Sequence, residues 1–352
     1  GNGVTVPAGR YVVYIEPAPG LANEVDGAFA PDVLSVPAEF YGGLVRSFRL
    51  PGAVPAVDPD TPGDYRIQDG YLRVGFNLLG QFSLGLNQAR LDEFGNPIET
   101  QSTKRIIDDS EEPSESYITY RVIKPDGQTV DVANWRAYDI APINPQVPIA
   151  ENDPANAALG GYVIANSIQV AELLQIQPLP RPDGTSTPTS LKVTIVAKNI
   201  TTGTVQCGLR KLLRVVPLEP HGQPVFWAGA NKYRYETTLQ GGAVPDVFTW
   251  SSDGPTSVSD KLIGIGLIGT PDVTRPEKLQ FANYYNIAQI GVSNPKFYDY
   301  VTKPQEPITD PAVAIQFAPR SLAPGEVTTF TVAVTYAVLG SYKDGPIPFF
   351  DD

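Results

Sequence analysis

The sequence contains no methionine, one cysteine and one histidine in 352 residues. With a single cysteine, Cys207, the chain cannot form an intramolecular disulfide. One cysteine and one histidine are also too few ligands for a zinc site of the usual His/Cys type. Any catalytic triad or Cys–His pair would have to use His221, which lies in a loop between a proline and a glycine. No nucleophile-elbow motif occurs either, so the sequence shows no constellation typical of nucleophilic catalysis.

Charge and long apolar runs are also scarce. Charged residues make up 18% of the chain, and 38 acidic residues outnumber 26 basic ones, which gives a net charge of −12. This balance argues against a nucleic-acid partner, because such binding rests on phosphate neutralisation by basic side chains. No stretch reaches the roughly 18 apolar residues of a transmembrane helix, so no membrane span is expected.

Glycine, proline and β-type residues are abundant instead. The chain has 32 glycines and 35 prolines, and 42% of its residues are hydrophobic, which is enough for a sizeable core. Residues 71–76 and 81–86 bracket a Leu-Gly turn and predict a β-hairpin. Residues 117–122 and 129–132 bracket a Pro-Asp-Gly turn and predict a second hairpin, because proline presets φ and glycine accepts a positive φ.

The second half of the chain gives the clearest β pattern. Further strands are predicted at residues 162–177, 190–197, 204–216 and 327–338. The segment 162–177 also tolerates a helix, but its Val-Ile pairs favour a strand. Strand-like segments separated by turn residues are typical of sandwiches and barrels rather than of βαβ units. We therefore predict an all-β fold, an antiparallel β-sandwich of jelly-roll-like type, as one enlarged sandwich or two sandwich domains.

Composition along the chain suggests three parts. Residues 1–60 are rich in proline and are expected to form an arm with the first strands. Residues 61–150 are expected to form a first sandwich part, and residues 151–352 a second one. The chain starts Gly-Asn-Gly without methionine, which is typical of a removed leader or a tag remnant.

A glycine-rich motif, G-x-G-x-x-G, occupies residues 264–269. In dinucleotide-binding proteins a helix begins at this motif and meets the pyrophosphate. Here Pro271 and Pro276 follow, and they argue against a continuing helix. The pattern favours a buried strand whose small residues let another layer pack closely.

Two acidic segments are candidate cation sites. Carboxylates gathered in a loop are the ligands that Ca²⁺ prefers, although neither segment matches the EF-hand pattern, and a solvated acidic loop explains both equally simply. A glycosidase pair could also be drawn from the acids of the chain. The candidate ligands are Asp58, Asp60, Asp64, Asp108 and Asp109.

Aromatic side chains and one sequon complete the candidate sites. Exposed tryptophan and tyrosine on a β face can stack on sugar rings or anchor a subunit interface, and they serve as core residues equally well. The sequon at Asn199 is a candidate glycan acceptor. The candidate interface or ligand-platform residues are Trp227, Tyr233, Tyr235, Trp250, Phe349 and Phe350.

Taken together, these features predict a non-enzymatic structural subunit that assembles with copies of itself, as in a surface layer, a filament or a capsid-type shell. Its terminal segments would add strands to a neighbour's sheet. The alternative is an extracellular carbohydrate-binding module, or a carbohydrate-active enzyme that uses two carboxylates on a β-sandwich. In either case glycans are candidate partners, Ca²⁺ is the one candidate cofactor, and the location is extracellular, at a cell surface or in a virion.

Overall fold

The fold is taken from a computed structural model. It describes residues 12–13, 36–37, 66–68, 72–77, 80–86, 105–108, 115–134, 140–148, 157–177, 190–216, 223–252, 261–269, 272–290 and 298–339.

The chain divides into two compact units, residues 1–61 and residues 62–352. In the first unit, β1 (Val12–Val13) pairs antiparallel with β2 (Val36–Pro37). All other described elements belong to the second unit. The three predicted sequence parts and their limits stay predictions.

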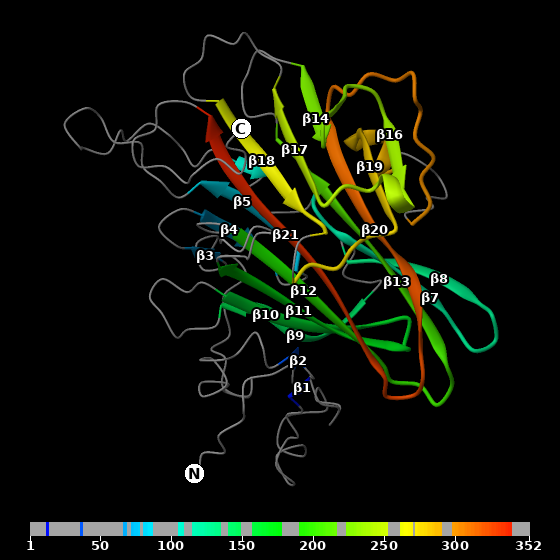
Figure 1. Ribbon diagram of the computed structural model, residues 1–352. Coiled ribbons are helices and arrows are strands. Elements are labelled where there is room, and N and C mark those ends of the chain that lie inside the picture. The colour runs from blue at the N-terminus through cyan, green and yellow to red at the C-terminus, as the bar shows by residue number, and fades with distance from the viewer. Residues whose placement is uncertain are drawn as a thin grey trace. The chain divides into compact units, whose positions relative to one another are not determined.

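A nine-stranded antiparallel sheet forms one layer of the second unit (Figure 1). Its strands, in spatial order, are β15 (Asn231–Tyr233), β14 (Pro224–Ala228), β17 (Val247–Ser252), β18 (Lys261–Leu267), β21 (Val327–Leu339), β12 (Ser190–Asn199), β11 (Ile168–Gln177), β10 (Ala157–Ile164) and β9 (Ile140–Pro148).

A six-stranded antiparallel sheet forms the second layer, and a four-stranded sheet adjoins it. The six strands, in spatial order, are β16 (Thr237–Gln240), β19 (Lys278–Asn283), β20 (Pro311–Leu322), β13 (Val205–Arg214), β7 (Ile118–Ile123) and β8 (Thr129–Ala133). The four are β3 (Arg66–Gln68), β4 (Leu72–Phe76), β5 (Phe82–Leu86) and β6 (Arg105–Ile107). Two short helices, the 3₁₀ turn η5 (Gly241–Ala243) and α1 (Tyr284–Ile287), complete the described elements.

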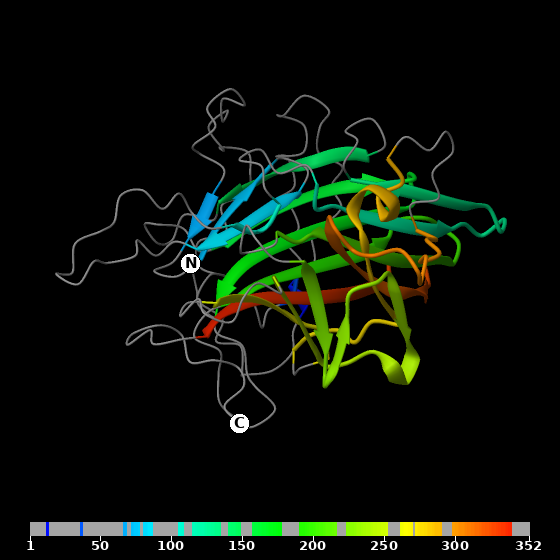
Figure 2. The ribbon, with the colours of Figure 1, turned by 90° about the horizontal axis from the view of Figure 1, so that it is seen from above.

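Figure 2 shows the layers from above, and the main hydrophobic core lies between them. Alternation along each strand points every second side chain inward, so β12 contributes Leu191, Val193 and Ile195 to the core. Rings from opposite sheets meet there: Phe226 of β14 stacks on Phe281 of β19 with centroids 4.4 Å apart. At the end of β13, Val215 bridges to Ile107, which joins the four-stranded sheet to the six-stranded layer.

The predicted all-β antiparallel sandwich is confirmed. Both predicted hairpins form, as β4–β5 and β7–β8, and β21 covers the predicted strand at residues 327–338. Segment 162–177 is strand, as β10 and β11. β12 and β13 follow each other in sequence but lie in different sheets, so they do not form a hairpin. No described helix is long and apolar enough to cross a membrane.

The glycine-rich motif lies on β18, which confirms a buried strand instead of a nucleotide loop. A methyl group on Gly264 would come within 2.0 Å of the Trp250 ring, and one on Gly266 within 2.2 Å of the Phe248 ring. Trp250 and Phe248 are both buried and face the core from β17. The glycines are therefore required by the close approach of these rings.

Replacing Gly266 with alanine is expected to lower the free energy of unfolding by about 1–3 kcal/mol, because the Phe248 ring must shift within a packed core. The matched control is Gly242→Ala, where an added methyl group meets nothing within 4 Å. Urea unfolding midpoints of both variants measure the effect. Equal midpoints would contradict the proposed packing.

Candidate functional site

A pocket of about 350 Å³ lies where β20 extends beyond its neighbour β19 and β21 extends beyond its neighbour β18. Among the described residues, the last pair between β19 and β20 is Lys278 with Gln316, and the last between β18 and β21 is Leu267 with Ala333. β20 and β21 both continue past these points. We call the resulting space the edge pocket, and its lining residues are Gly241, Arg275, Pro276, Glu277, Phe317, Ala318 and Arg320.

One wall of the edge pocket is a segment that crosses between the two sheets. Thr274 donates its backbone N–H to Thr331 of β21 and accepts one from it through its hydroxyl, both at 3.0 Å. Three residues later, Glu277 donates its N–H to the carbonyl of Gln316 on β20, and Gly241 donates to the carbonyl of Glu277. Backbone hydrogen bonds therefore fix this wall to both layers.

A β-bulge shapes the opposite wall. Cys207 of β13 pairs with Arg320 and Leu209 pairs with Phe317, so one residue of β13 opposes two residues of β20. Such a bulge re-aims side chains and is common beside functional sites. Its effect here is that Phe317 and Arg320, three positions apart, both face β21.

The bulge depends on a close contact with Tyr298. The Tyr298 hydroxyl donates a 2.6 Å hydrogen bond to the carbonyl of Phe317. Burial raises the pKa of Tyr298 above its ordinary value, so the hydroxyl keeps its proton at neutral pH. A methyl group on Gly208 would come within 2.4 Å of this hydroxyl, which explains a glycine at the bulge.

Arg320 is held in one orientation by β21. Its Nη1 donates to the Thr328 hydroxyl at 2.8 Å and to the Thr329 carbonyl at 2.9 Å. Its guanidinium carbon lies 4.6 Å from the centre of the Phe330 ring, which is a cation–π contact. Desolvation by burial lowers the pKa of Arg320, which still leaves a guanidinium charged at neutral pH.

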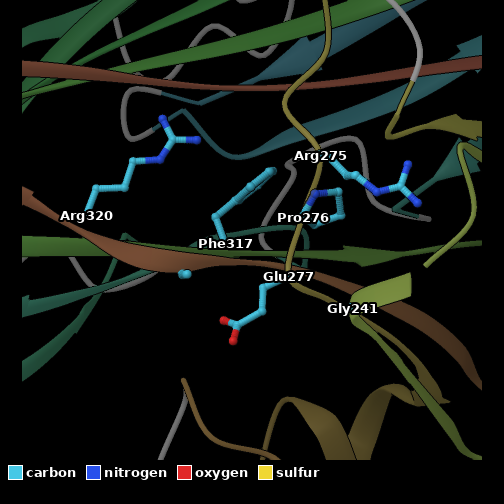
Figure 3. A pocket seen from close by; sticks show the side chains of 7 residues that line it. Gly241, Arg275, Pro276, Glu277, Phe317 and Arg320 are labelled. Carbon is cyan, nitrogen blue, oxygen red and sulfur yellow. The ribbon is translucent and has the colours of Figure 1, made fainter. Parts of the chain in front are cut away.

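The other two charged residues of the edge pocket point elsewhere (Figure 3). Arg275 donates to the carboxylate of Asp246 and to the carbonyl of Val244, so its charge is compensated by its own chain. The Glu277 carboxylate points away from both guanidinium groups. Arg320 is thus the charge that lies beside the Phe317 ring in the pocket.

A second polar cluster lies in the interior of the sandwich. Glu172 of β11 and Lys211 of β13 are fully buried at core-facing positions, with Nζ 3.8 Å from Oε1. The hydroxyl of Tyr162 lies 3.4 Å from Oε2 of Glu172 and 2.6 Å from the hydroxyl of Tyr120. Lys211 Nζ also lies 4.4 Å from the centre of the Phe82 ring. The cluster therefore connects all three sheets of the second unit.

Burial shifts both charged groups of this interior pair toward neutrality. Desolvation raises the pKa of Glu172 to about 7, against the opposing effect of Lys211. Desolvation lowers the pKa of Lys211 to about 8, against the opposing effect of Glu172. Such shifts are common in catalytic groups, but both side chains are 0% exposed, so a ligand does not reach them in this conformation.

Another buried carboxylate, that of Glu236, has a structural role. One of its oxygens accepts hydrogen bonds from the Asn283 N–H and the Asn286 amide. The other accepts from the Tyr300 hydroxyl at 2.6 Å and from the Lys303 N–H at 2.9 Å. With both oxygens engaged, Glu236 fixes α1 and the following loop rather than a ligand.

Of the predicted calcium ligands, the structure describes Asp108 alone. Asp108 is buried with φ of 57°, and its carboxylate accepts the backbone N–H of Glu115 at 2.8 Å. Among the described residues no group of three metal-ligating side chains occurs. The other four predicted ligands, Asp58, Asp60, Asp64 and Asp109, lie outside the described residues, so a calcium site stays a prediction.

The predicted aromatic platform is divided between core and surface. Trp250 is 2% exposed and belongs to the core. Tyr233 is half-buried and packs against the core. Trp227 and Tyr235 are exposed, and Lys232 lies 5.0 Å from the centre of the Trp227 ring. Phe349 and Phe350 lie outside the described residues.

The predicted glycan acceptor is a buried turn residue. Asn199 is 0% exposed, and its amide nitrogen donates to the carbonyls of Gly203 and Leu322. Its amide oxygen accepts from the N–H and the hydroxyl of Thr201. The sequon therefore stabilises the turn between β12 and β13, and glycosylation stays a prediction. His221 lies outside the described residues.

Sequence analysis missed the interior pair and Arg320. The pair had a signal: Glu172 and Lys211 each interrupt a run of apolar residues at alternate positions, which places a charge on the core face of a strand. Arg320 had none, because its direction depends on the bulge opposite Gly208, and local alternation does not reveal a change of register.

No protein-family model and no curated protein matches the sequence. Several solved structures resemble the fold. A galactose mutarotase-like protein from Lactobacillus casei ATCC 334 is 8% identical, with a TM-score of 0.43 over 78% of this chain and 100% of that one. A galactose mutarotase related enzyme from Lactobacillus acidophilus is 9% identical, with a TM-score of 0.41 over 79% and 98%. The galactosidase domain of an alpha-galactosidase-sucrose kinase is 10% identical, with a TM-score of 0.37 over 78% of this chain and 40% of that one.

These names contradict the prediction of a self-assembling structural subunit of a surface layer, filament or capsid. They are names of sugar-acting proteins, so that prediction is wrong and its alternative is kept. The accompanying prediction that the chain is not an enzyme is not supported.

The buried pair of Glu172 and Lys211 predicts a specific pH dependence of the free energy of unfolding. Between pH 4.5 and 7 the unfolded chain releases the Glu172 proton before the folded one, so stability falls as pH rises. Between pH 8 and 10.5 the folded chain has already released the Lys211 proton, so stability rises again. Each slope reaches at most about 1.4 kcal/mol per pH unit.

The measurement is urea unfolding of the wild type and of the double variant Glu172→Gln, Lys211→Met from pH 5 to pH 10. We expect the difference in unfolding free energy between the two proteins to pass through a minimum near pH 7–8, with the wild type relatively weakest there. Taking the difference between the two proteins removes the contribution of all the other titrating groups, because both proteins contain them. A difference that stays constant across this range would refute the buried pair.

Proposed function

We propose that this protein binds carbohydrate in the edge pocket. The observation that carries the proposal is the chemistry of the pocket lining. Three apolar residues line a space of about 350 Å³ beside the guanidinium of Arg320: Ala318 is exposed, and Pro276 and Phe317 are buried behind it. This volume is at the small end of ligand pockets, and a few polar groups among apolar ones are typical of them.

A sugar suits this combination of groups. Sugar rings present apolar C–H surface on their faces and hydroxyl groups around their edges. The exposed Ala318 offers an apolar contact, and the guanidinium of Arg320 offers hydrogen-bond donors beside it. The extracellular location expected from the composition is part of the proposal, because a protein outside the cell meets polysaccharides.

A second candidate is an enzyme that acts on the bound sugar. Glu277 is the one carboxylate among the described residues that line the pocket, so the two-carboxylate arrangement of glycoside hydrolysis is not built from these residues. Electrostatic stabilisation by the Arg320 guanidinium is the chemistry that this lining could support. Binding is the proposal, and turnover is tested in the same experiment.

The test is a glycan array probed with the full chain, followed by calorimetry on the sugars that bind. Ala318→Trp fills the pocket with an indole ring, and we expect it to weaken binding at least about tenfold. Ala318 is exposed, so the fold should tolerate the change, and Ala230→Trp is the matched control at an exposed alanine outside the pocket.

Retention of binding by Ala318→Trp would overturn the assignment to the edge pocket. Absence of any bound sugar for the folded wild type would overturn carbohydrate binding itself. Proton NMR of the bound sugars, followed over time, reports a changed anomer ratio or a new reducing end if the protein also turns them over.

A further inference from the structure

Arg320 differs from other half-buried arginines of the same sheet. Arg121 pairs with Asp131 and Asp299, and Arg214 pairs with Glu115 and Asp310. Burial lowers the pKa of both guanidinium groups, but the hydrogen bonds that they donate to these carboxylates outweigh it and raise both pKa values. Among the described residues no carboxylate pairs with Arg320, whose partners are a hydroxyl, a carbonyl and an aromatic ring.

The geometry leaves one edge of this guanidinium available. Both hydrogen bonds to β21 use Nη1, and the Phe330 ring covers one face of the group. The Nε–H and Nη2–H donors along the other edge keep the parallel arrangement that a carboxylate accepts with both oxygens. Because Thr328, Thr329 and Phe330 already fix the side chain, little conformational entropy remains to be lost on binding.

We propose that the sugar recognised by the edge pocket is acidic, a uronic acid whose carboxylate binds the Nε–Nη2 edge of Arg320. This inference rests on the proposed function and specifies its substrate class. A carboxylate supplies the negative charge that the described residues do not place beside Arg320. Glu277 points to the other side of β20, so its charge does not oppose an anion at this position, and Arg275, which is paired with Asp246, does not compete with Arg320 for that anion.

The test compares uronic-acid oligosaccharides with their methyl esters, which keep every ring and hydroxyl but lose the charge. Oligosaccharides of galacturonate and of glucuronate serve as probes, and affinities are measured by calorimetry at low salt. We expect at least one acid to bind about ten- to a hundredfold more tightly than its ester, because a hydrogen-bonded charge pair is lost on esterification.

Variants at Arg320 separate charge from geometry. Arg320→Gln should bring the acid to the affinity of the ester and leave the ester unchanged, and Arg320→Lys should restore only part of the difference, since lysine lacks the planar fork. Lys124→Gln removes one positive charge outside the pocket and should change neither affinity. The comparison of acid with ester in the wild type needs no variant, so it holds even if an Arg320 variant fails to fold.

Equal affinity for acids and esters would overturn this inference while the proposed function stands. The same holds if neutral sugars of the glycan array bind and the acids do not. If no sugar of any kind binds the folded chain, the proposed function fails, and the inference fails with it.

Discussion

The structure depends on β20 and β21 facing each other across the core from different sheets. A turn at residues 323–326 joins the two strands. Inside the core, the rings of Phe317 and Phe330 meet with centroids 5.3 Å apart. Because each strand continues past one neighbour, the sandwich cannot close fully at this end. The edge pocket is the consequence: it is bounded by strands that are rigidly held on their other sides by β13 and β12.

The interior shows that this sandwich tolerates buried charge when the charges are matched. Glu172 and Lys211 face each other from opposite sheets, and Tyr162 and Tyr120 extend the contact as a hydroxyl pair. Removing two charges from water costs free energy that their attraction only partly returns. Their position where the three sheets meet suits a role in fixing the sheets relative to one another, whereas Arg320 at the edge has no such partner within the chain's described part.

Local pattern was sufficient for the strands but not for their assembly. The β4–β5 and β7–β8 hairpins follow from turn residues and alternation, because both are short-range signals. The separation of β12 from β13 into two sheets has no local signal, since the two strands alternate alike. The edge pocket combines η5, the segment before β19 and the end of β20, and a single bulge opposite Gly208 decides where Arg320 points.

The central claim is that the bulge directs an uncompensated Arg320 into a ligand pocket at the edge of the sandwich. The most direct measurement is a crystal structure of the full chain grown with a uronic-acid oligosaccharide. The account predicts the sugar in the edge pocket beside Ala318, with its carboxylate on the Nε–Nη2 edge of Arg320 and the Tyr298 hydroxyl still bonded to the Phe317 carbonyl. A regular β13–β20 ladder, or Arg320 paired with a carboxylate of its own chain, would contradict it.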